Sequence, residues 1–251
     1  MLLIKHKWKV ASLVLGISLV SFFSFYGRGL WFPVYLKMAG NRTIKEVINQ
    51  YGPIVEPKVI ARFKKAGIIY PPQKIGFYAI KQDKKLELWA MSGTNWGKVT
   101  TYPILKASGH LGPKLTEGDK QVPEGIYHIS GLNPNSAYHL SMKLNYPNPF
   151  DLKQAQKEGR NNPGSNIFIH GKAVSVGCLA MGDEAIEELF ILVQKMGLQE
   201  VEVIISPTDT RLAKLKAPPG APVWTADLYQ QITQASLKYS KGQFPGNWDI
   251  N

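Results

Sequence analysis

Cysteine is nearly absent from this 251-residue chain, whose single example is Cys178. One cysteine cannot form an intramolecular disulfide or build the thiolate cluster of a structural zinc site. The thiol is therefore either an inert packing group or a reactive one. Three of the five histidines, His110, His128 and His139, lie in separate segments and lack the i, i+4 spacing of a metal-binding pair. We therefore expect no metal ion.

Acidic residues are also scarce, with 18 Asp and Glu against 30 Lys and Arg and a net charge of +12. Such an excess favours an anionic partner: nucleic acid, a lipid surface or an acidic polymer. No helix-turn-helix, zinc-finger spacing or aromatic RNA-binding strand is present, which argues against nucleic acid. The stretch Gly109–Gly112 lacks the Lys-Ser/Thr of a phosphate-binding loop, and we expect no cofactor. The hydrophobic fraction of 44% predicts a globular protein.

The N-terminal segment indicates export. Lys5, Lys7 and Lys9 precede the apolar run Val10–Tyr26, and no small-x-small cleavage site follows the run. This pattern predicts an uncleaved signal or membrane anchor with its N-terminus in the cytoplasm and the body outside, on the periplasmic side of the envelope. A buried N-terminal core helix is the structural alternative.

The body of the chain predicts strands flanked by helices. A short helix is expected at Asn41–Gly52, capped by Thr43 and stopped by the Gly-Pro pair, with a second at Pro57–Ala66. From Lys74 the hydrophobic period changes to two, which predicts a hairpin over 74–91. Further strands are expected at 98–105, 125–130, 137–144, 166–170 and 201–205.

One strongly amphipathic helix follows residue 182. Asp183 is placed to cap it, and Glu184, Glu187 and Glu188 are expected to face water. A last helix is expected at Thr225–Tyr239. The fold class is thus mainly β with flanking helices (α+β). We divide the chain into an anchor (1–26), a helical lead-in (27–73), a strand-rich domain (74–205), and a linker with a C-terminal helix (206–251).

The segment 166–183 carries the chemistry. It contains His170 at a strand end and Cys178 eight positions later, separated by a loop with Gly171 and Gly177 at its ends. A thiolate is a strong nucleophile toward a carbonyl carbon, and His170 could take its proton as general base. The amides of Gly177 and Cys178 could point at a developing oxyanion, with Ser175 in support. A buried, inert thiol is the alternative.

These residues resemble the active-site motif of the L,D-transpeptidase catalytic domain (YkuD type). The resemblance is to a subgroup with a short His-to-Cys spacing and an S-x-G-C-x-A-M-x-D ending, here Ser175 to Asp183. Upstream, Gly118-Asp119 and Pro123–Tyr127 are similar to the G-D and T-P-x-G-x-Y/F elements of that family. Tyr138–Ser141 and Asn145–Asn148 also resemble the subgroup. The likeness covers about 74–205 and implies the β-rich fold of that family.

The family pattern has departures here. Val122 replaces the Thr of the T-P element, Val176 replaces a second His, and Ala180 replaces an Arg found in most members. The subgroup shares the last two changes. Loss of that Arg leaves open how the donor peptide is recognised.

The resemblance implies a cysteine enzyme that acts on peptidoglycan stem peptides outside the membrane. Cys178 would be the nucleophile and His170 the general base and acid, with Gly177, Ser175 and Gly171 in support. The thiolate would expel the terminal D-alanine and form a thioester, which an amine acceptor then resolves in cell-wall assembly or remodelling. Candidate substrate-binding residues are Tyr138, His139, Lys172 and Arg160.

Two other functions remain open at this level. A hydrolase of the same family would pass the thioester to water and cut a wall peptide or a wall–lipoprotein linkage. A non-catalytic anchor would bind the anionic wall through its basic surface and keep Cys178 buried and unreactive.

Overall fold

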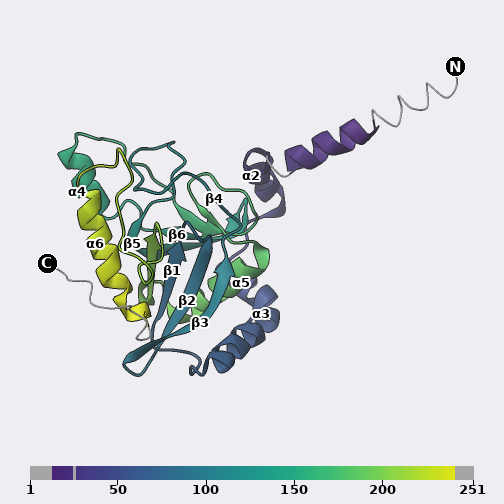
Figure 1. Cartoon of the computed structure of the whole chain (residues 1–251). Coiled ribbons are helices and arrows are strands. Elements are labelled where there is room, and N and C mark those ends of the chain that lie inside the picture. Colours follow the sequence, from purple (N-terminus) through teal and green to yellow (C-terminus); the bar gives the residue numbers. More distant parts are fainter. Residues whose placement is uncertain (1–12, 25–26, 241–251) are drawn as a thin grey trace, which may run out of the picture. The chain divides into compact units, whose positions relative to one another are not determined.

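The computed structural model describes residues 13–24 and 27–240 of the chain (Figure 1). The chain divides into two compact units, Met1–Arg42 and Thr43–Asn251. The domain boundaries expected from the sequence stay predictions.

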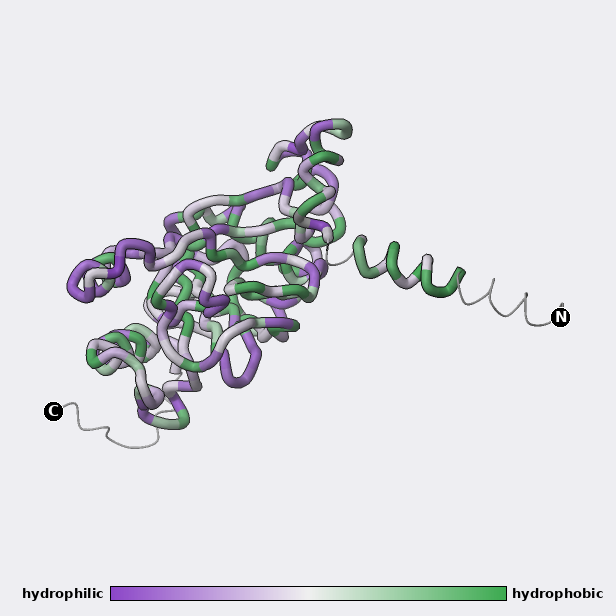
Figure 2. Tube along the Cα trace, turned by 90° about the horizontal axis from the view of Figure 1, so that it is seen from above, coloured by the Kyte–Doolittle hydropathy of each residue, from purple (hydrophilic) through white to green (hydrophobic). Residues whose placement is uncertain are grey.

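The first unit is helical. One helix covers residues 13–24, and α2 spans Arg28–Ala39. The side chains of 13–24 are apolar or small, and this helix is coloured mostly as hydrophobic in Figure 2. Within the described residues, no helix combines the length and the apolar character needed to cross a membrane. The expected anchor lies partly in 1–12 and 25–26, outside the described residues, and stays a prediction.

The second unit begins with α3 (Ile44–Ala66), which starts three residues after the expected Asn41 and directly after the expected cap, Thr43. The Thr43 hydroxyl accepts a hydrogen bond from the Glu46 amide at 3.2 Å, and the Thr43 amide donates to the Glu46 carboxylate at 2.6 Å. This reciprocal capping box satisfies two amides at the start of the helix. The cap at Thr43 is confirmed.

The expected stop at Gly52-Pro53 is wrong, because α3 continues through Pro53 and Pro57 and joins the two expected helices into one. A proline inside a helix costs about 3 kcal/mol, since it removes a hydrogen bond and crowds the preceding turn. Burial of one large apolar side chain contributes about 1.5–3 kcal/mol. Four such side chains on α3 lie in the core and outweigh the prolines: Val47, Val55, Val59 and Phe63.

A single mixed sheet forms the centre of this unit, and the described residues contribute nine strands to it in the order β3-β2-β1-β9-β5-β6-β7-β8-β4. The strand bounds are β1 Ile75–Ile80, β2 Lys85–Ser92, β3 Asn95–Pro103, β4 Lys106–Ala107, β5 Gly125–Ser136, β6 His139–Leu144, β7 Phe168–His170, β8 Leu179–Ala180 and β9 Val201–Ser206. The predicted 74–91 hairpin is β1 and β2. The last strand in sequence, β9, lies between β1, to which it is parallel, and β5.

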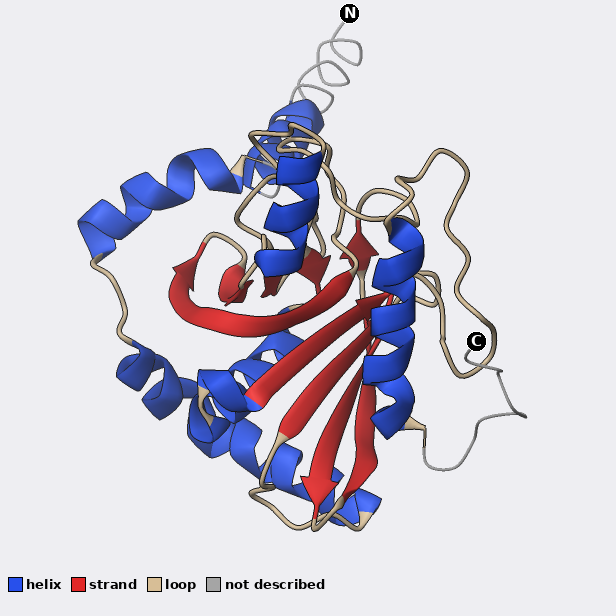
Figure 3. Cartoon of the chain, turned by 90° about the vertical axis from the view of Figure 1, so that its left-hand side faces the viewer, coloured by secondary structure: helices blue, strands red, loops and turns tan. Residues whose placement is uncertain are grey.

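Helices cover both faces of the sheet (Figure 3). On one face α3 contacts β3 and α5 (Asp183–Met196) contacts β6. On the other, α6 (Thr225–Ser236) and the 3-10 turn η2 (Leu237–Tyr239) close a second apolar cluster. Adjacent residues of β1 belong to different apolar clusters. Phe77 lies in the cluster that includes residues of α3 and α5, and Tyr78 lies in the cluster that includes residues of α6. The remaining helices are α4 (Pro149–Lys157) and the 3-10 turn η1 (Leu198–Glu200). The predicted α+β class is confirmed.

Two expectations about α5 are wrong. Its N-cap is Gly182, and Asp183 instead accepts a hydrogen bond from the Lys172 amide at 2.9 Å. Glu188 does not face water; it is 1% exposed and receives two hydrogen bonds from Arg62, at 2.7 and 3.0 Å, and one from the Tyr102 hydroxyl at 2.7 Å. A buried carboxylate is tolerated because these three donors replace its water shell.

Candidate active site

The strands β7 and β8 bring the histidine and the cysteine to neighbouring positions of the sheet. β7 ends at His170, and β8 begins at Leu179, the residue after Cys178. The two strands are parallel, with Ile169 opposite Leu179 and His170 opposite Ala180. The intervening loop therefore doubles back and places Cys178 at the start of the strand beside the one that carries His170.

His170 is 2% exposed and its ring orientation is fixed by its own neighbour. Nδ1 lies 2.6 Å from the carbonyl oxygen of Gly171. Because a carbonyl can only accept, Nδ1 carries the proton and the neutral ring keeps an unprotonated Nε2. Burial lowers the pKa of His170, although the hydrogen bond to Gly171 opposes this effect. The ring is therefore neutral at pH 7, with one nitrogen able to accept a proton.

Cys178 is partly buried at the end of the loop. Its Sγ lies 3.9 Å from the carbonyl oxygen of Asn166. Burial raises the pKa of the thiol, partly offset by a hydrogen bond with the Phe168 backbone and by the charge of Lys114. Within residues 13–24 and 27–240, no hydrogen bond joins Cys178 to His170. The resting site therefore contains a neutral thiol and a neutral imidazole.

The amides of Gly177 and Cys178 already have acceptors. The Gly177 amide donates to the Ser108 hydroxyl at 2.6 Å, and the Cys178 amide donates to the Ser175 hydroxyl at 3.2 Å. The Ser108 hydroxyl in turn donates to the Lys120 carbonyl at 2.7 Å. A substrate oxygen that uses these two amides has to replace both serine hydroxyls. Sequence analysis missed Ser108, which is 69 positions from Gly177 and belongs to no recognisable motif.

Gly171 is required by close packing. A Cβ at this position would lie 2.7 Å from the Tyr138 carbonyl oxygen and 2.8 Å from the Asp183 carboxylate. The Gly171 amide also donates to the Leu140 carbonyl at 3.1 Å. The glycine thus lets the carbonyl that orients His170 fit against β6 and α5.

Two predicted substrate-binding residues, both cations, are engaged within the protein. Lys172 forms an ion pair with Asp183. Arg160 donates to the Leu115 carbonyl at 2.6 Å and pairs with the Glu158 carboxylate at 2.7 Å. These contacts compete with a substrate carboxylate for both cations.

The other two predicted substrate-binding residues, Tyr138 and His139, are adjacent in the sequence, where the β5–β6 turn leads into β6. The His139 ring is 2.7 Å from the Glu187 carboxylate and makes an edge contact with Tyr51 of α3, so it joins β6 to two helices. Tyr138 is different, because its ring lies against His170 with a centroid distance of 4.7 Å.

The upstream motif residues stabilise a loop close to the site. Asp119 pairs with the buried amine of Lys114 and accepts hydrogen bonds from the amides of Leu115, Thr116 and Gln121. Burial alone would raise the pKa of Asp119, but these donors together lower it. The Lys114 amine lies near enough to Cys178 for its charge to favour the thiolate.

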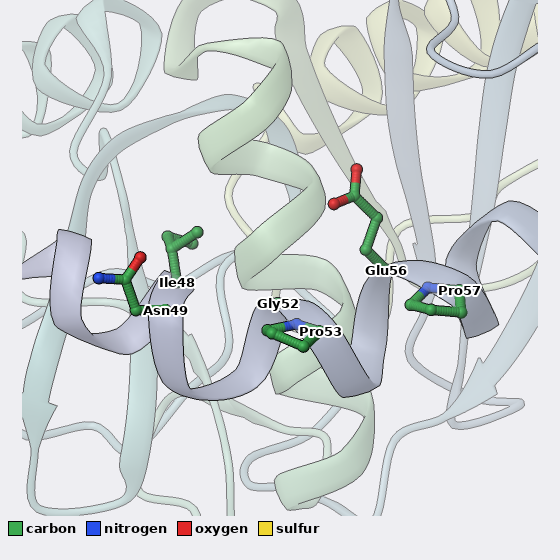
Figure 4. A pocket seen from close by; sticks show the side chains of 6 residues that line it. All are labelled: Ile48, Asn49, Gly52, Pro53, Glu56 and Pro57. Atoms are coloured by element: carbon green, nitrogen blue, oxygen red, sulfur yellow. The ribbon is translucent and has the colours of Figure 1, made fainter.

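A separate hollow of about 500 Å³ runs along α3 (Figure 4). It is lined by Ile48, Asn49, Gly52, Pro53, Glu56 and Pro57. None of the predicted site residues lines it. Within the described part of the chain, no three His, Cys, Asp or Glu side chains are grouped so that they could hold a metal ion.

Comparison with known proteins agrees with the motif. The family model of the L,D-transpeptidase catalytic domain (YkuD) matches residues 72–224. YafK of Escherichia coli K12, described as a putative L,D-transpeptidase, is 33% identical over 144 residues, which are 54% of this chain and 56% of YafK. The chain thus spans about half the length of the curated relatives it matches. The crystal structure of Pgp2 from Campylobacter jejuni, a helical cell shape determining protein, is 24% identical over 54% of this chain and 48% of Pgp2, with a TM-score of 0.46. Since the family model covers more than half of the sequence, this chain belongs to the L,D-transpeptidase catalytic domain family.

Proposed function

We propose that this chain is a cysteine acyltransferase that acts on peptidoglycan stem peptides. The observation that carries the proposal is the 2.6 Å contact between His170 Nδ1 and the Gly171 carbonyl, in the strand beside Cys178. It leaves Nε2 as the only ring nitrogen able to take a proton. Family membership supports the choice of substrate.

The reaction begins with a neutral pair. His170 Nε2 accepts the thiol proton of Cys178 as the sulfur attacks the carbonyl carbon of the L-centre of the diamino acid. The bond to the terminal D-alanine breaks, and His170 returns the proton to the leaving amine. The product is a thioester on Cys178. An amine acceptor then attacks the thioester, forms a new amide and frees the thiol.

The directions of the two pKa shifts favour this order of events. Burial raises the pKa of Cys178 and lowers that of His170, so a separated thiolate and imidazolium are disfavoured before substrate binds. The proton therefore moves during attack. The oxyanion of the tetrahedral intermediate would be bound by the Gly177 and Cys178 amides after it replaces the hydroxyls of Ser108 and Ser175.

The place of action that we propose is the cell envelope, on the periplasmic side. The basic N-terminal residues, the apolar run up to Tyr26 and the net charge of +12 support an exported protein that stays near an anionic wall polymer. In this proposal the N-terminal segment holds the chain at the inner membrane.

The test uses the full chain and its Cys178→Ala variant with tetrapeptide muropeptides, and mass spectrometry of the products and of the intact protein. We expect release of D-alanine, a thioester adduct on the wild-type chain, and crosslinked or amine-exchanged products. Cys178→Ala should give neither product nor adduct. Equal turnover by both chains would overturn the proposal.

The same experiment separates the two other functions. Release of a linked peptide with water incorporated, and without amine exchange, would identify a hydrolase. Absence of both product and thioester adduct with either substrate would identify a wall-binding anchor. Wall fragments with linked lipoprotein are included as a second substrate for the hydrolase.

A further inference from the structure

The edge strand β4 carries a lysine in line with the proposed catalytic histidine. Lys106 pairs in register with Ala180, and Ala180 pairs on its other side with His170. Residues paired in register share one face of a sheet, so the three side chains form one row. Lys106 lies two strand spacings, or roughly 10 Å, from His170.

The charge of Lys106 has no partner among the described residues. Its side chain is exposed, and within residues 13–24 and 27–240 it makes no hydrogen bond or ion pair. The two cations that the sequence suggested for substrate carboxylates, Lys172 and Arg160, both have protein partners. Ala180, between Lys106 and His170, carries no charge. Among the described residues of this row, Lys106 is therefore the cation that no protein group occupies.

We propose that Lys106 binds the carboxylate of the terminal D-alanine of the stem peptide. This inference rests on the proposed function, in which Cys178 attacks the carbonyl that precedes this D-alanine. The terminal D-alanine directly follows the scissile bond. Because consecutive Cα atoms are about 3.8 Å apart, its carboxylate stays close to the carbonyl that Cys178 attacks. The long, flexible stem of a lysine suits a single carboxylate at this distance from the sheet. Lys106 thereby selects peptides that end in a free acid.

The test compares two substrates that differ in that one group. The full chain is given a stem tetrapeptide ending in D-alanine and the same peptide ending in D-alaninamide, and kcat/KM is measured for each. The variants are Lys106→Met, which keeps the length and removes the charge, and Lys106→Arg. Lys153→Met, at an exposed lysine of α4, is the matched control.

With the free acid, Lys106→Met should lower kcat/KM about 10- to 100-fold, the ratio expected for one hydrogen bond between charged groups. With the amide, Lys106→Met and the wild type should have the same kcat/KM. For the wild type this value should lie well below its kcat/KM for the free acid. Lys106→Arg should keep most of the wild-type kcat/KM on the free acid. Lys153→Met should leave kcat/KM unchanged on both substrates.

An unchanged kcat/KM for Lys106→Met, or an equal loss on acid and amide, overturns the role of Lys106 and leaves the proposed function intact. A wild-type chain that turns over neither peptide and forms no adduct overturns the proposed function and this inference together.

Discussion

The phenol ring of Tyr138 lies against the imidazole of His170, with centroids 4.7 Å apart and planes tilted by 32°. Tyr138 lies in the turn between β5 and β6, and β6 pairs with β7 so that Ser141 stands opposite His170. The Gly171 carbonyl holds the same imidazole at Nδ1. Two contacts from different segments thus fix the orientation of the proposed base.

Replacing Tyr138 should therefore change the rate of the reaction. An aromatic pair contributes about 0.5–1.5 kcal/mol beyond the area it buries. We expect Tyr138→Ala to lower kcat roughly 3- to 10-fold, because His170 gains freedom to rotate, and Tyr138→Phe to stay close to the wild type. Steady-state kinetics on the muropeptide substrate measure this. A large loss in Tyr138→Phe would show that the hydroxyl, and not the ring contact, matters.

The pH dependence of the thiol should reveal a neutral resting pair. Burial raises the pKa of Cys178, so its alkylation by iodoacetamide should become fast only above the usual thiol range. Burial also lowers the pKa of His170 despite its bond to Gly171, so kcat/KM should fall on the acid side only below the ordinary histidine value of 6.5. Alkylation and kcat/KM are measured across the range from acid to alkaline pH. A thiol that is half-ionised below neutral pH would contradict this expectation and indicate a preformed thiolate–imidazolium pair.

Gly171→Ala should damage both folding and activity. The added Cβ would meet the Tyr138 carbonyl at 2.7 Å, and backbone cannot move aside easily. We expect a loss of about 1–3 kcal/mol in the free energy of unfolding and a larger loss of activity, because the Gly171 carbonyl orients His170. Gly131→Ala is the control, since a Cβ there has no neighbour within 4 Å. If denaturant titration and turnover show equal effects for both variants, close packing at Gly171 is not the cause.

Asp151, in the first turn of α4, should make stability depend on pH. Burial raises its pKa to about 6, against the hydrogen bond from the Asn148 amide. The folded state therefore favours the protonated carboxyl. Its stabilising effect is complete below the unfolded pKa near 3.8 and is lost as the pH rises through about 6.

Above that range the buried carboxylate should cost about 3 kcal/mol, from a shift of about two pKa units. Asp151→Asn keeps an acceptor for the Asn148 amide and removes this cost. The variant should unfold at a higher temperature than the wild type at about pH 7.5 and at a similar temperature at about pH 4. A variant that is less stable than the wild type at the higher pH would contradict the assignment.

The candidate site was largely predictable because its central residues lie in one short segment. His170, the glycine-bounded loop and Cys178 all fall within 166–183, and a strand end followed by such a loop is a local pattern. Ser108 was not predictable, since its bond to Gly177 joins positions 69 apart. The same holds for the ion pair between Arg62 and Glu188, which are 126 positions apart.

The length of α3 shows how tertiary contacts override a local signal. The Gly52-Pro53 pair predicts a helix end, and an isolated peptide has nothing to oppose it. In the folded chain, Val55, Val59 and Phe63 beyond the first proline are buried in the core. Their burial keeps the helix intact through both prolines.

The sequence by itself determined what depends on neighbours along the chain: the Thr43 cap, the 74–91 hairpin, and the strand end and glycine-bounded loop that connect His170 to Cys178. These features follow from hydrogen bonds and hydrophobic periods within a few residues. Only the tertiary structure decided the central place of β9, the burial of Glu188 and the alignment of Lys106 with His170. Strand pairing and buried ion pairs join distant segments, and their energies exist only once the chain has folded.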